Sequence, residues 1–228
     1  MKAGENQAER VQKLFAEHAR AWDALYDGRR GPIARLLDRH FRRDIYERYE
    51  LTFAELGADL QSSTVLDVGC GTGVYCVEAA RRGATKVTGI DISPVMIARA
   101  QARAAAYGFD DRSEFVCSEF PSKILAGRQF QFAIVMGVMD YVAEPSLFLA
   151  ELRRVVTGRA VLSFPGRHWL RERLRRHRYR VLGRCAVYGY DEREIRAACL
   201  SAGFGGVTIR RLDHSGICYI TTAYSFLQ

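Results

Sequence analysis

The chain has 228 residues, of which 48% are hydrophobic and 26% charged. This length suits one α/β domain with a substantial core, and no run of eighteen apolar residues predicts a membrane span. Residues 1–10 lack the apolar part of a secretory signal. Six scattered cysteines without a Cys-x-x-Cys pair predict reduced thiols rather than disulfides or zinc. We therefore expect a cytoplasmic protein with no metal site.

The net charge of +8 comes from 34 basic and 26 acidic residues, and the excess is uneven. Residues 167–184, RHWLRERLRRHRYRVLGR, carry eight arginines and two histidines against one glutamate. A smaller basic run covers residues 29–43. Such clusters attract anionic substrates, nucleic acid or a membrane surface, whereas the plain alternative is a solvated helix face.

The N-terminal quarter is predicted to be helical. Apolar residues recur at spacings of three and four in residues 5–27 and again in 33–57, and the stretch from Gly28 to Pro32 separates the two helices.

From Thr64 onward, short apolar runs alternate with helical patterns. The predicted strands are 64–68, 86–91, 114–117, 130–136 and 160–164, followed by a closing antiparallel pair, 207–212 and 218–226. The predicted helices are 73–82, 94–107, 145–156 and 191–202. Ser93 is expected to cap the second of these, with Pro94 at its first position. This alternation predicts a single α/β domain with a doubly wound parallel sheet.

The segment from Val65 to Gly73, VLDVGCGTG, predicts a strand, a tight glycine turn and a helix whose N-terminus faces a ligand. Asp91 ends the next strand, where a carboxylate can accept hydrogen bonds from a ribose diol. Dinucleotide enzymes use G-x-G-x-x-G to hold a pyrophosphate, but the spacing here is G-x-G-x-G. Asp67, two residues before Gly69, would repel a pyrophosphate and suits a ligand that carries an ammonium group.

Two stretches, VLDVGCGTG and VTGIDISPVMIARA, resemble the first two motifs of class I S-adenosylmethionine-dependent methyltransferases. The likeness extends through residues 64–164 and more weakly to the C-terminus. FVCSEF resembles the third motif, with Glu119 where Asp is more usual, and FAIVMGVMDYV resembles the fourth strand and the loop beside the methyl group. The resemblance implies a seven-stranded Rossmann-like sheet, mostly parallel with an antiparallel C-terminal strand, and helices on both faces.

The same resemblance implies S-adenosyl-L-methionine as cofactor and assigns roles by position. Asp67 would anchor its methionine end and Asp91 its ribose. Residues 1–57 would form a helical lid, 58–228 the catalytic core, and 165–190 an acceptor-side insertion. The other cofactor residues implied are Gly69, Gly71 and Gly73 as the backbone cradle, Ile92 against adenine, Met96, Ser118, Glu119, Phe120, Met136 and Tyr26. Phe120 and Met136 could instead be core residues, and Tyr26 and Tyr46 helix packing.

Methyl transfer from a sulfonium mainly needs alignment of the acceptor, and a base only where the acceptor must lose a proton. Asp140 and Tyr141 after the fourth strand and His168 after the fifth are the candidates, because open α/β sheets bind ligands at the carboxyl ends of strands. Asp140 could instead cap the following helix, and His168 could be a surface histidine.

The acceptor is expected to be a small molecule. The Asn/Asp-Pro-Pro-Tyr signature of the relatives that methylate amino groups of nucleic acids is absent, since residues 139–142 read MDYV. No cysteine-based motif of RNA cytosine methylation and no appended RNA-binding domain is present. Arginines after the fifth strand could bind a phosphate or carboxylate, beside an aromatic wall from Trp169 and Tyr179. The named arginines are Arg167, Arg171 and Arg175. An RNA methyltransferase that uses this segment, a non-catalytic cofactor-binding protein and a nucleotide-dependent oxidoreductase stay open.

Overall fold

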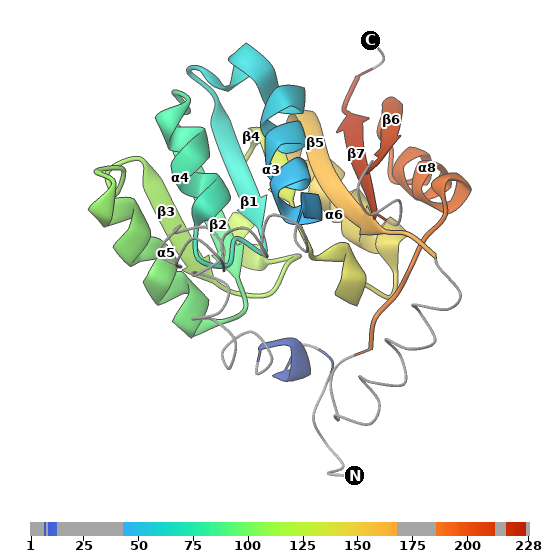
Figure 1. Ribbon diagram of the computed structural model, residues 1–228, viewed down its shortest axis with the longest axis horizontal. Coiled ribbons are helices and arrows are strands. Elements are labelled where there is room, and N and C mark those ends of the chain that lie inside the picture. Colours follow the sequence, from blue (N-terminus) through green and yellow to red (C-terminus); the bar gives the residue numbers. More distant parts are fainter. Residues whose placement is uncertain (1–6, 8, 13–42, 168–185, 213–217, 227–228) are drawn as a thin grey trace.

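The computed structural model describes residues 7, 9–12, 43–167, 186–212 and 218–226. One sheet organises the chain (Figure 1). Its strands are β1 Thr64–Val68, β2 Lys86–Asp91, β3 Ser113–Cys117, β4 Phe130–Val135, β5 Val156–Pro165, β6 Gly206–Arg211 and β7 Cys218–Tyr224. They lie in the order β3-β2-β1-β4-β5-β7-β6.

The sheet is parallel except at β7. β1 pairs in parallel with β2 and β4, β2 with β3, and β4 with β5, whereas β7 runs antiparallel to both β5 and β6. The predicted seven-stranded Rossmann-like fold is confirmed. The predicted closing pair also forms, but β7 lies between β5 and β6. β5 begins at Val156, directly after the helix that ends at Val155, and is therefore longer than the predicted 160–164.

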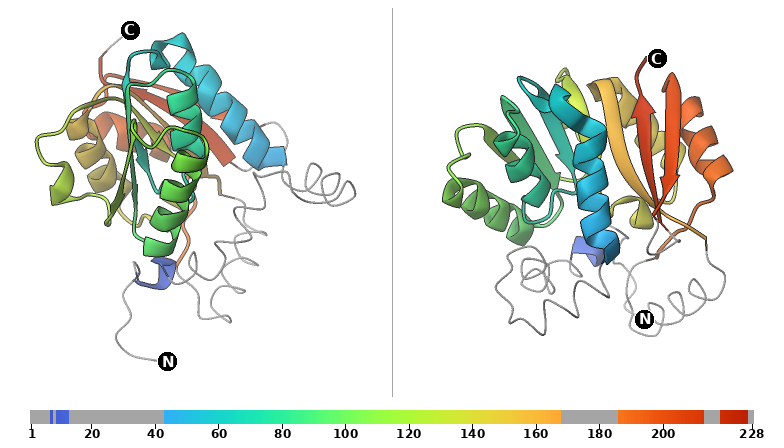
Figure 2. Two further views of the ribbon diagram at one scale, coloured as in Figure 1. Left: turned by 90° about the vertical axis from the view of Figure 1, so that its left-hand side faces the viewer. Right: turned by 45° about the horizontal axis from the view of Figure 1, so that its top comes forward.

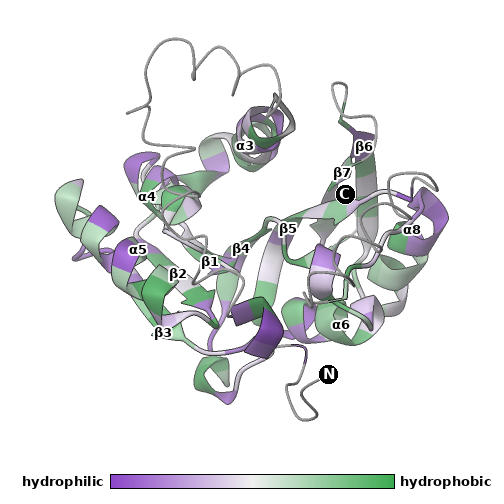
Figure 3. Cartoon of the chain, turned by 60° about the horizontal axis from the view of Figure 1, so that its bottom comes forward, coloured by the Kyte–Doolittle hydropathy of each residue, from purple (hydrophilic) through white to green (hydrophobic). Residues whose placement is uncertain are grey.

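Helices cover both faces of the sheet. They are α3 Arg43–Leu56, α4 Val74–Arg81, α5 Pro94–Ala106, α6 Pro145–Val155 and α8 Glu192–Ser201, with short 3-10 turns η1 Gly57–Leu60, η2 Lys123–Leu125 and η3 Met139–Tyr141. α3, α4 and α5 lie on one face, and α6 and α8 on the other (Figures 2 and 3). None of the helices in the described ranges is long and apolar enough to cross a membrane.

The two-residue period of the strands divides the core into two clusters. In β1, Val65 packs in the cluster that contains Phe53 of α3 and Tyr75 of α4, whereas Leu66 and Val68 pack in the cluster of α6 and α8. Successive side chains of a strand point to opposite faces. Asp67 therefore shares the face of Val65 and is directed toward α4.

The predicted start of α5 is correct, whereas α6 starts without a cap from Asp140. Ser93 caps α5, since its hydroxyl accepts from the Met96 N–H at 3.4 Å, and Pro94 occupies the first turn as expected. α6 begins at Pro145 after Glu144, which makes no side-chain cap. The alternative that Asp140 caps α6 is therefore wrong, because Asp140 lies in η3, before the loop that leads to α6.

Candidate active site

A cavity of about 510 Å³ lies at the carboxyl ends of β1, β2 and β4. Parallel strands deliver their following loops to this one edge of the sheet, which is where open α/β sheets bind ligands. The predicted residues that line it are Asp67, Gly69, Gly71, Asp91, Ile92, Met96, Ser118, Glu119, Phe120, Met136, Asp140 and Tyr141.

The glycine loop is held against the end of β2. The N–H groups of Gly69 and Cys70 donate to the Ile90 carbonyl at 2.8 and 3.1 Å. Gly71 has φ +53, and a Cβ there would meet nothing within 4 Å, so its backbone borders open space in the cavity. Gly73 differs: it does not line the cavity, and a Cβ there would approach the Cβ of Ala100 in α5 to 2.9 Å.

Asp91 joins the two loops that border the cavity. Its Oδ2 accepts from the Gly71 N–H and its Oδ1 from the Ser93 N–H, both at 2.9 Å. Each carboxylate oxygen can accept a second hydrogen bond, so the pair is still able to receive two hydroxyls. Burial raises the pKa of Asp91, and the two amide donors act against that rise.

Asp67 is the buried carboxyl of the site, with 1% of its surface exposed. Burial raises its pKa to about 7, the nearby charge of Asp91 adds to the rise, and the Cys76 thiol opposes it by donating to Oδ2 at 3.2 Å. Burial also raises the pKa of Cys76, which keeps this thiol protonated as the donor. A cationic group placed beside Asp67 would favour its ionised form.

The loop after β3 forms one end of the cavity. The Ser118 N–H donates to the Asp91 carbonyl at 3.0 Å, and the Ser118 hydroxyl lies 2.9 Å from that of Ser122. The Phe120 ring packs edge-on against Phe148 of α6, with 5.0 Å between centroids. These contacts give this end an apolar wall with polar groups at its rim, which suits a heteroaromatic ring.

The turn η3 also lines the cavity. Asp140 and Tyr141 are both half-buried and line the cavity. The Asp140 carbonyl accepts from the Tyr188 N–H at 2.9 Å, and the Tyr190 hydroxyl donates to the Val142 carbonyl at 2.5 Å. The described residues that precede α8 thus support the loop after β4.

Comparison with known proteins agrees with this geometry. Residues 65–158 match the family model described as a methyltransferase domain. The fold resembles that of magnesium protoporphyrin IX methyltransferase from Synechocystis PCC 6803 with bound S-adenosylmethionine, with a TM-score of 0.74 and 20% identity over 98% of this chain and 99% of that one. Together these similarities support the resemblance to class I S-adenosylmethionine-dependent methyltransferases.

Two curated methyltransferases share part of the sequence. Ajmaline N-methyltransferase of Rauvolfia serpentina is 27% identical over 150 residues, which are 65% of this chain and 48% of that protein. Ribosomal protein L11 methyltransferase of Colwellia psychrerythraea is 36% identical over 100 residues, 40% of this chain and 33% of that one. The chain therefore spans between about a third and a half of the length of these relatives.

The arginine-rich segment, residues 167–184, is described only at Arg167. Arg167 is exposed, lies outside the cofactor cavity, and pairs with Glu194 of α8 at 2.7 Å and with Asp191, the N-cap of α8, at 4.0 Å. It borders a separate groove with Tyr190. Tyr46 is 41% exposed and does not line the cavity either. Six of the candidates from the sequence lie outside the described ranges: Tyr26, His168, Trp169, Arg171, Arg175 and Tyr179.

Several residues that line the cavity were not predicted from the sequence. Arg48 of α3 is the one cation among the described residues that line the cavity. It lies one helical turn before Thr52, whose hydroxyl contacts the Met136 sulfur at 3.6 Å, so the same face of α3 looks onto the end of β4. Gln7 and Val11 line the cavity as well. Their periodicity indicated only helices, not the surface that those helices would cover.

Proposed function

We propose that the protein transfers a methyl group from S-adenosylmethionine to the oxygen or nitrogen of a small-molecule acceptor. The observation that carries this proposal is the pair Asp67 and Asp91 on either side of an open glycine loop in one cavity. A buried carboxyl whose pKa is raised suits a cationic ligand, and a carboxylate with remaining lone pairs suits a diol.

The residues present fit the cofactor along its length. Ser118, Glu119 and Phe120 would receive the adenine, and Asp91 the ribose. Gly71 leaves room for the ligand to approach its backbone, because a Cβ at this position would occupy open space. Asp67 would lie toward the positively charged methionine end, and the guanidinium of Arg48 would balance the carboxylate of that end.

When bound, the cofactor supplies a methyl group activated by the sulfonium. The chain has to exclude water and hold the acceptor in line, and such alignment is worth about 7–11 kcal/mol in favourable cases. Asp140 and Tyr141 line the end of the cavity beyond the glycine loop, so their side chains would orient the acceptor. Asp140 would take the proton of an acceptor that must lose one.

We further propose that the acceptor bears an anionic group. Arg171 and Arg175 belong to a strongly basic stretch of the sequence that follows β5. The similar methyltransferases that are named for ajmaline and for magnesium protoporphyrin IX support a small molecule, whereas a third is named for ribosomal protein L11. Neutralising Arg171 and Arg175 should raise the Michaelis constant for the acceptor, and an unchanged constant would argue against this recognition.

RNA as acceptor is the second candidate, favoured by the net charge of +8. Binding of bulk RNA that falls steeply with salt and supports methyl incorporation would favour it over a small molecule.

Calorimetric titration tests the cofactor. S-adenosylmethionine and its demethylated product S-adenosylhomocysteine should bind, whereas NAD⁺ and NADH should not. Preferential binding of a nicotinamide cofactor would overturn the proposal in favour of an oxidoreductase. A screen with labelled methyl donor against acidic metabolites, tetrapyrroles and small aromatic compounds then tests turnover, and binding without turnover of any acceptor, RNA included, would favour a non-catalytic binding protein.

A further inference from the structure

Residues 186–190, the described end of the β5–α8 connection, form a crossing segment at the acceptor end of the cavity. Beside β5, the Tyr190 N–H donates to the Pro165 carbonyl at 2.8 Å, and the Arg167 N–H donates to the Tyr190 carbonyl at 3.2 Å. Toward the cavity, the Tyr188 N–H donates to the Asp140 carbonyl at 2.9 Å. The crossing segment is therefore hydrogen-bonded to η3, which carries Asp140 and Tyr141.

The other end of the crossing segment is held by the Gln7 side chain. The Ala186 N–H donates to Gln7 Oε1 at 3.1 Å, and Gln7 Nε2 donates to the Ala186 carbonyl at 2.9 Å. A carboxamide presents a donor and an acceptor side by side and so satisfies both groups of one peptide residue. This contact joins residues 179 positions apart. Ala186 is exposed, so water competes for both bonds and the contact can open and re-form.

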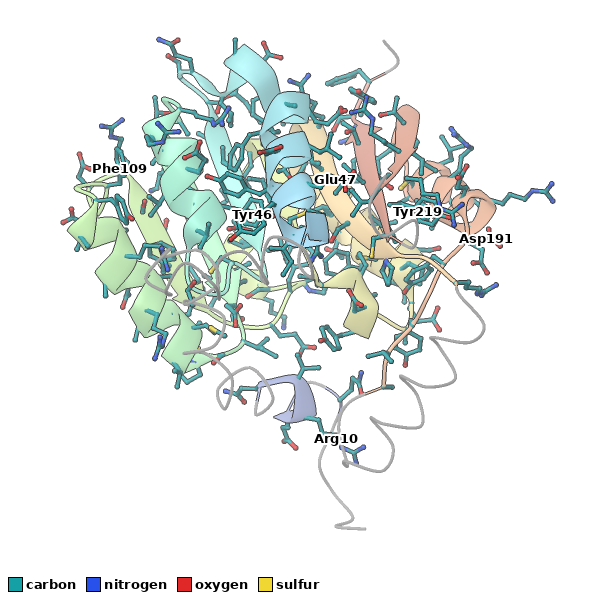
Figure 4. All side chains as sticks on the ribbon, viewed as in Figure 1. Arg10, Tyr46, Glu47, Phe109, Asp191 and Tyr219 are labelled. Carbon is teal, nitrogen blue, oxygen red and sulfur yellow. The ribbon has the colours of Figure 1, made fainter. Side chains whose placement is uncertain are left out.

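Gln7 also faces the cofactor cavity. It lines the cavity together with Val11, which lies one helical turn later and is 9% exposed. Arg10 lies on the same helical segment, beyond the carboxyl ends of the strands, and is labelled in Figure 4. A ligand that fills the cavity would touch Gln7 and Val11 on one side and η3 on the other.

We infer that Gln7 is a positioning residue that couples cofactor binding to the arrangement of the acceptor end. A ligand that contacts Gln7 and Val11 in the cavity would hold the Gln7 carboxamide against Ala186. The crossing segment would then hold Asp140 and Tyr141 through Tyr188. This inference rests on the proposed function, because it takes the cofactor to be S-adenosylmethionine or its product.

Hydrogen exchange of the full-length protein, with and without S-adenosylhomocysteine, tests the coupling. The variant is Gln7→Leu, which keeps the size of the side chain but can form neither bond, and the matched control is Gln101→Leu on the exposed face of α5. In the wild type and the control, the ligand should slow exchange in residues 186–190 by about fivefold or more, the effect of one net hydrogen bond. In Gln7→Leu this slowing should disappear.

Equal slowing in Gln7→Leu and wild type would overturn the inference. Faster exchange in Gln7→Leu by the same factor with and without ligand would also overturn it, because that result describes a purely structural contact. The calorimetric affinity for S-adenosylhomocysteine separates the two proposals. Binding to the wild type without coupling removes only the role of Gln7, whereas absence of binding removes the proposed function as well.

Discussion

At the scale of single residues, Asp91 connects the glycine loop with the start of α5 and faces the space where a ribose would lie. We predict that Asp91→Ala weakens binding of S-adenosylhomocysteine by roughly 10–150-fold, because hydrogen bonds to a charged group contribute about 1.5–3 kcal/mol. Calorimetric titration measures the effect, and Asp111→Ala in an exposed loop is the control. Unchanged affinity in Asp91→Ala would remove Asp91 from the site.

The raised pKa of Asp67 predicts that the affinity for the ligand depends on pH. Its pKa is raised from 3.8 to about 7 in the folded protein, so the empty site holds a protonated carboxyl below that pH and an ionised one above it. The ammonium group of S-adenosylhomocysteine should bind best to the ionised form. The affinity for S-adenosylhomocysteine should therefore rise about tenfold from pH 6 to pH 8 and level off above.

The control for this pH dependence is Asp67→Asn, which has no titratable group and should bind with an affinity that is nearly flat over the same range. Titrations at each pH measure both proteins. A wild-type affinity that is flat, or that falls as the pH rises, would contradict the predicted role of Asp67.

At the scale of elements, the two glycines that precede α4 have different roles: Gly71 borders the cavity, and Gly73 allows close packing against α5. A Cβ at Gly73 would press against Ala100 of α5, whereas a Cβ at Gly71 would enter the cavity. We predict that Gly73→Ala lowers the free energy of unfolding by about 2–4 kcal/mol, from left-handed strain plus overpacking. Gly108→Ala, with φ +71 and open space around it, should cost only about 1 kcal/mol.

Gly71→Ala should weaken ligand binding more than it lowers stability. Its stability loss should match that of Gly108→Ala, about 1 kcal/mol, while its affinity for S-adenosylhomocysteine should fall clearly. Chemical denaturation and calorimetry on the three variants check both predictions. Loss of stability alone in Gly71→Ala, with unchanged binding, would show that the ligand does not approach this backbone.

At the scale of the whole molecule, the two core clusters share a single sheet, so ligand binding at its edge should stabilise the fold as one unit. A ligand at 100 times its dissociation constant adds about 2.7 kcal/mol. For a domain of this size that energy raises Tm by about 5–10 °C. Thermal unfolding followed by far- and near-ultraviolet circular dichroism should show one coincident transition that shifts with S-adenosylhomocysteine. Separate transitions for the two signals would contradict a single cooperative unit.

The sequence by itself determined the local elements and the cofactor loop. The bounds of β1 and β2 agree with prediction to the residue, and Ser93 caps α5, because strand periodicity and capping depend on neighbours within a few positions. The placement of Asp67 and Asp91 beside one glycine loop follows from the same local pattern, since each lies at or next to the carboxyl end of a parallel strand.

Only the tertiary structure decided which distant residues share the cavity. It placed β7 between β5 and β6, turned Gly73 toward α5, paired Arg167 with α8, and brought Arg48 and Gln7 to the cavity. Each of these outcomes depends on contacts between segments that are far apart in the chain. Local spacing specifies which way a side chain points from its own element, but the packing of the elements against one another determines what that side chain meets.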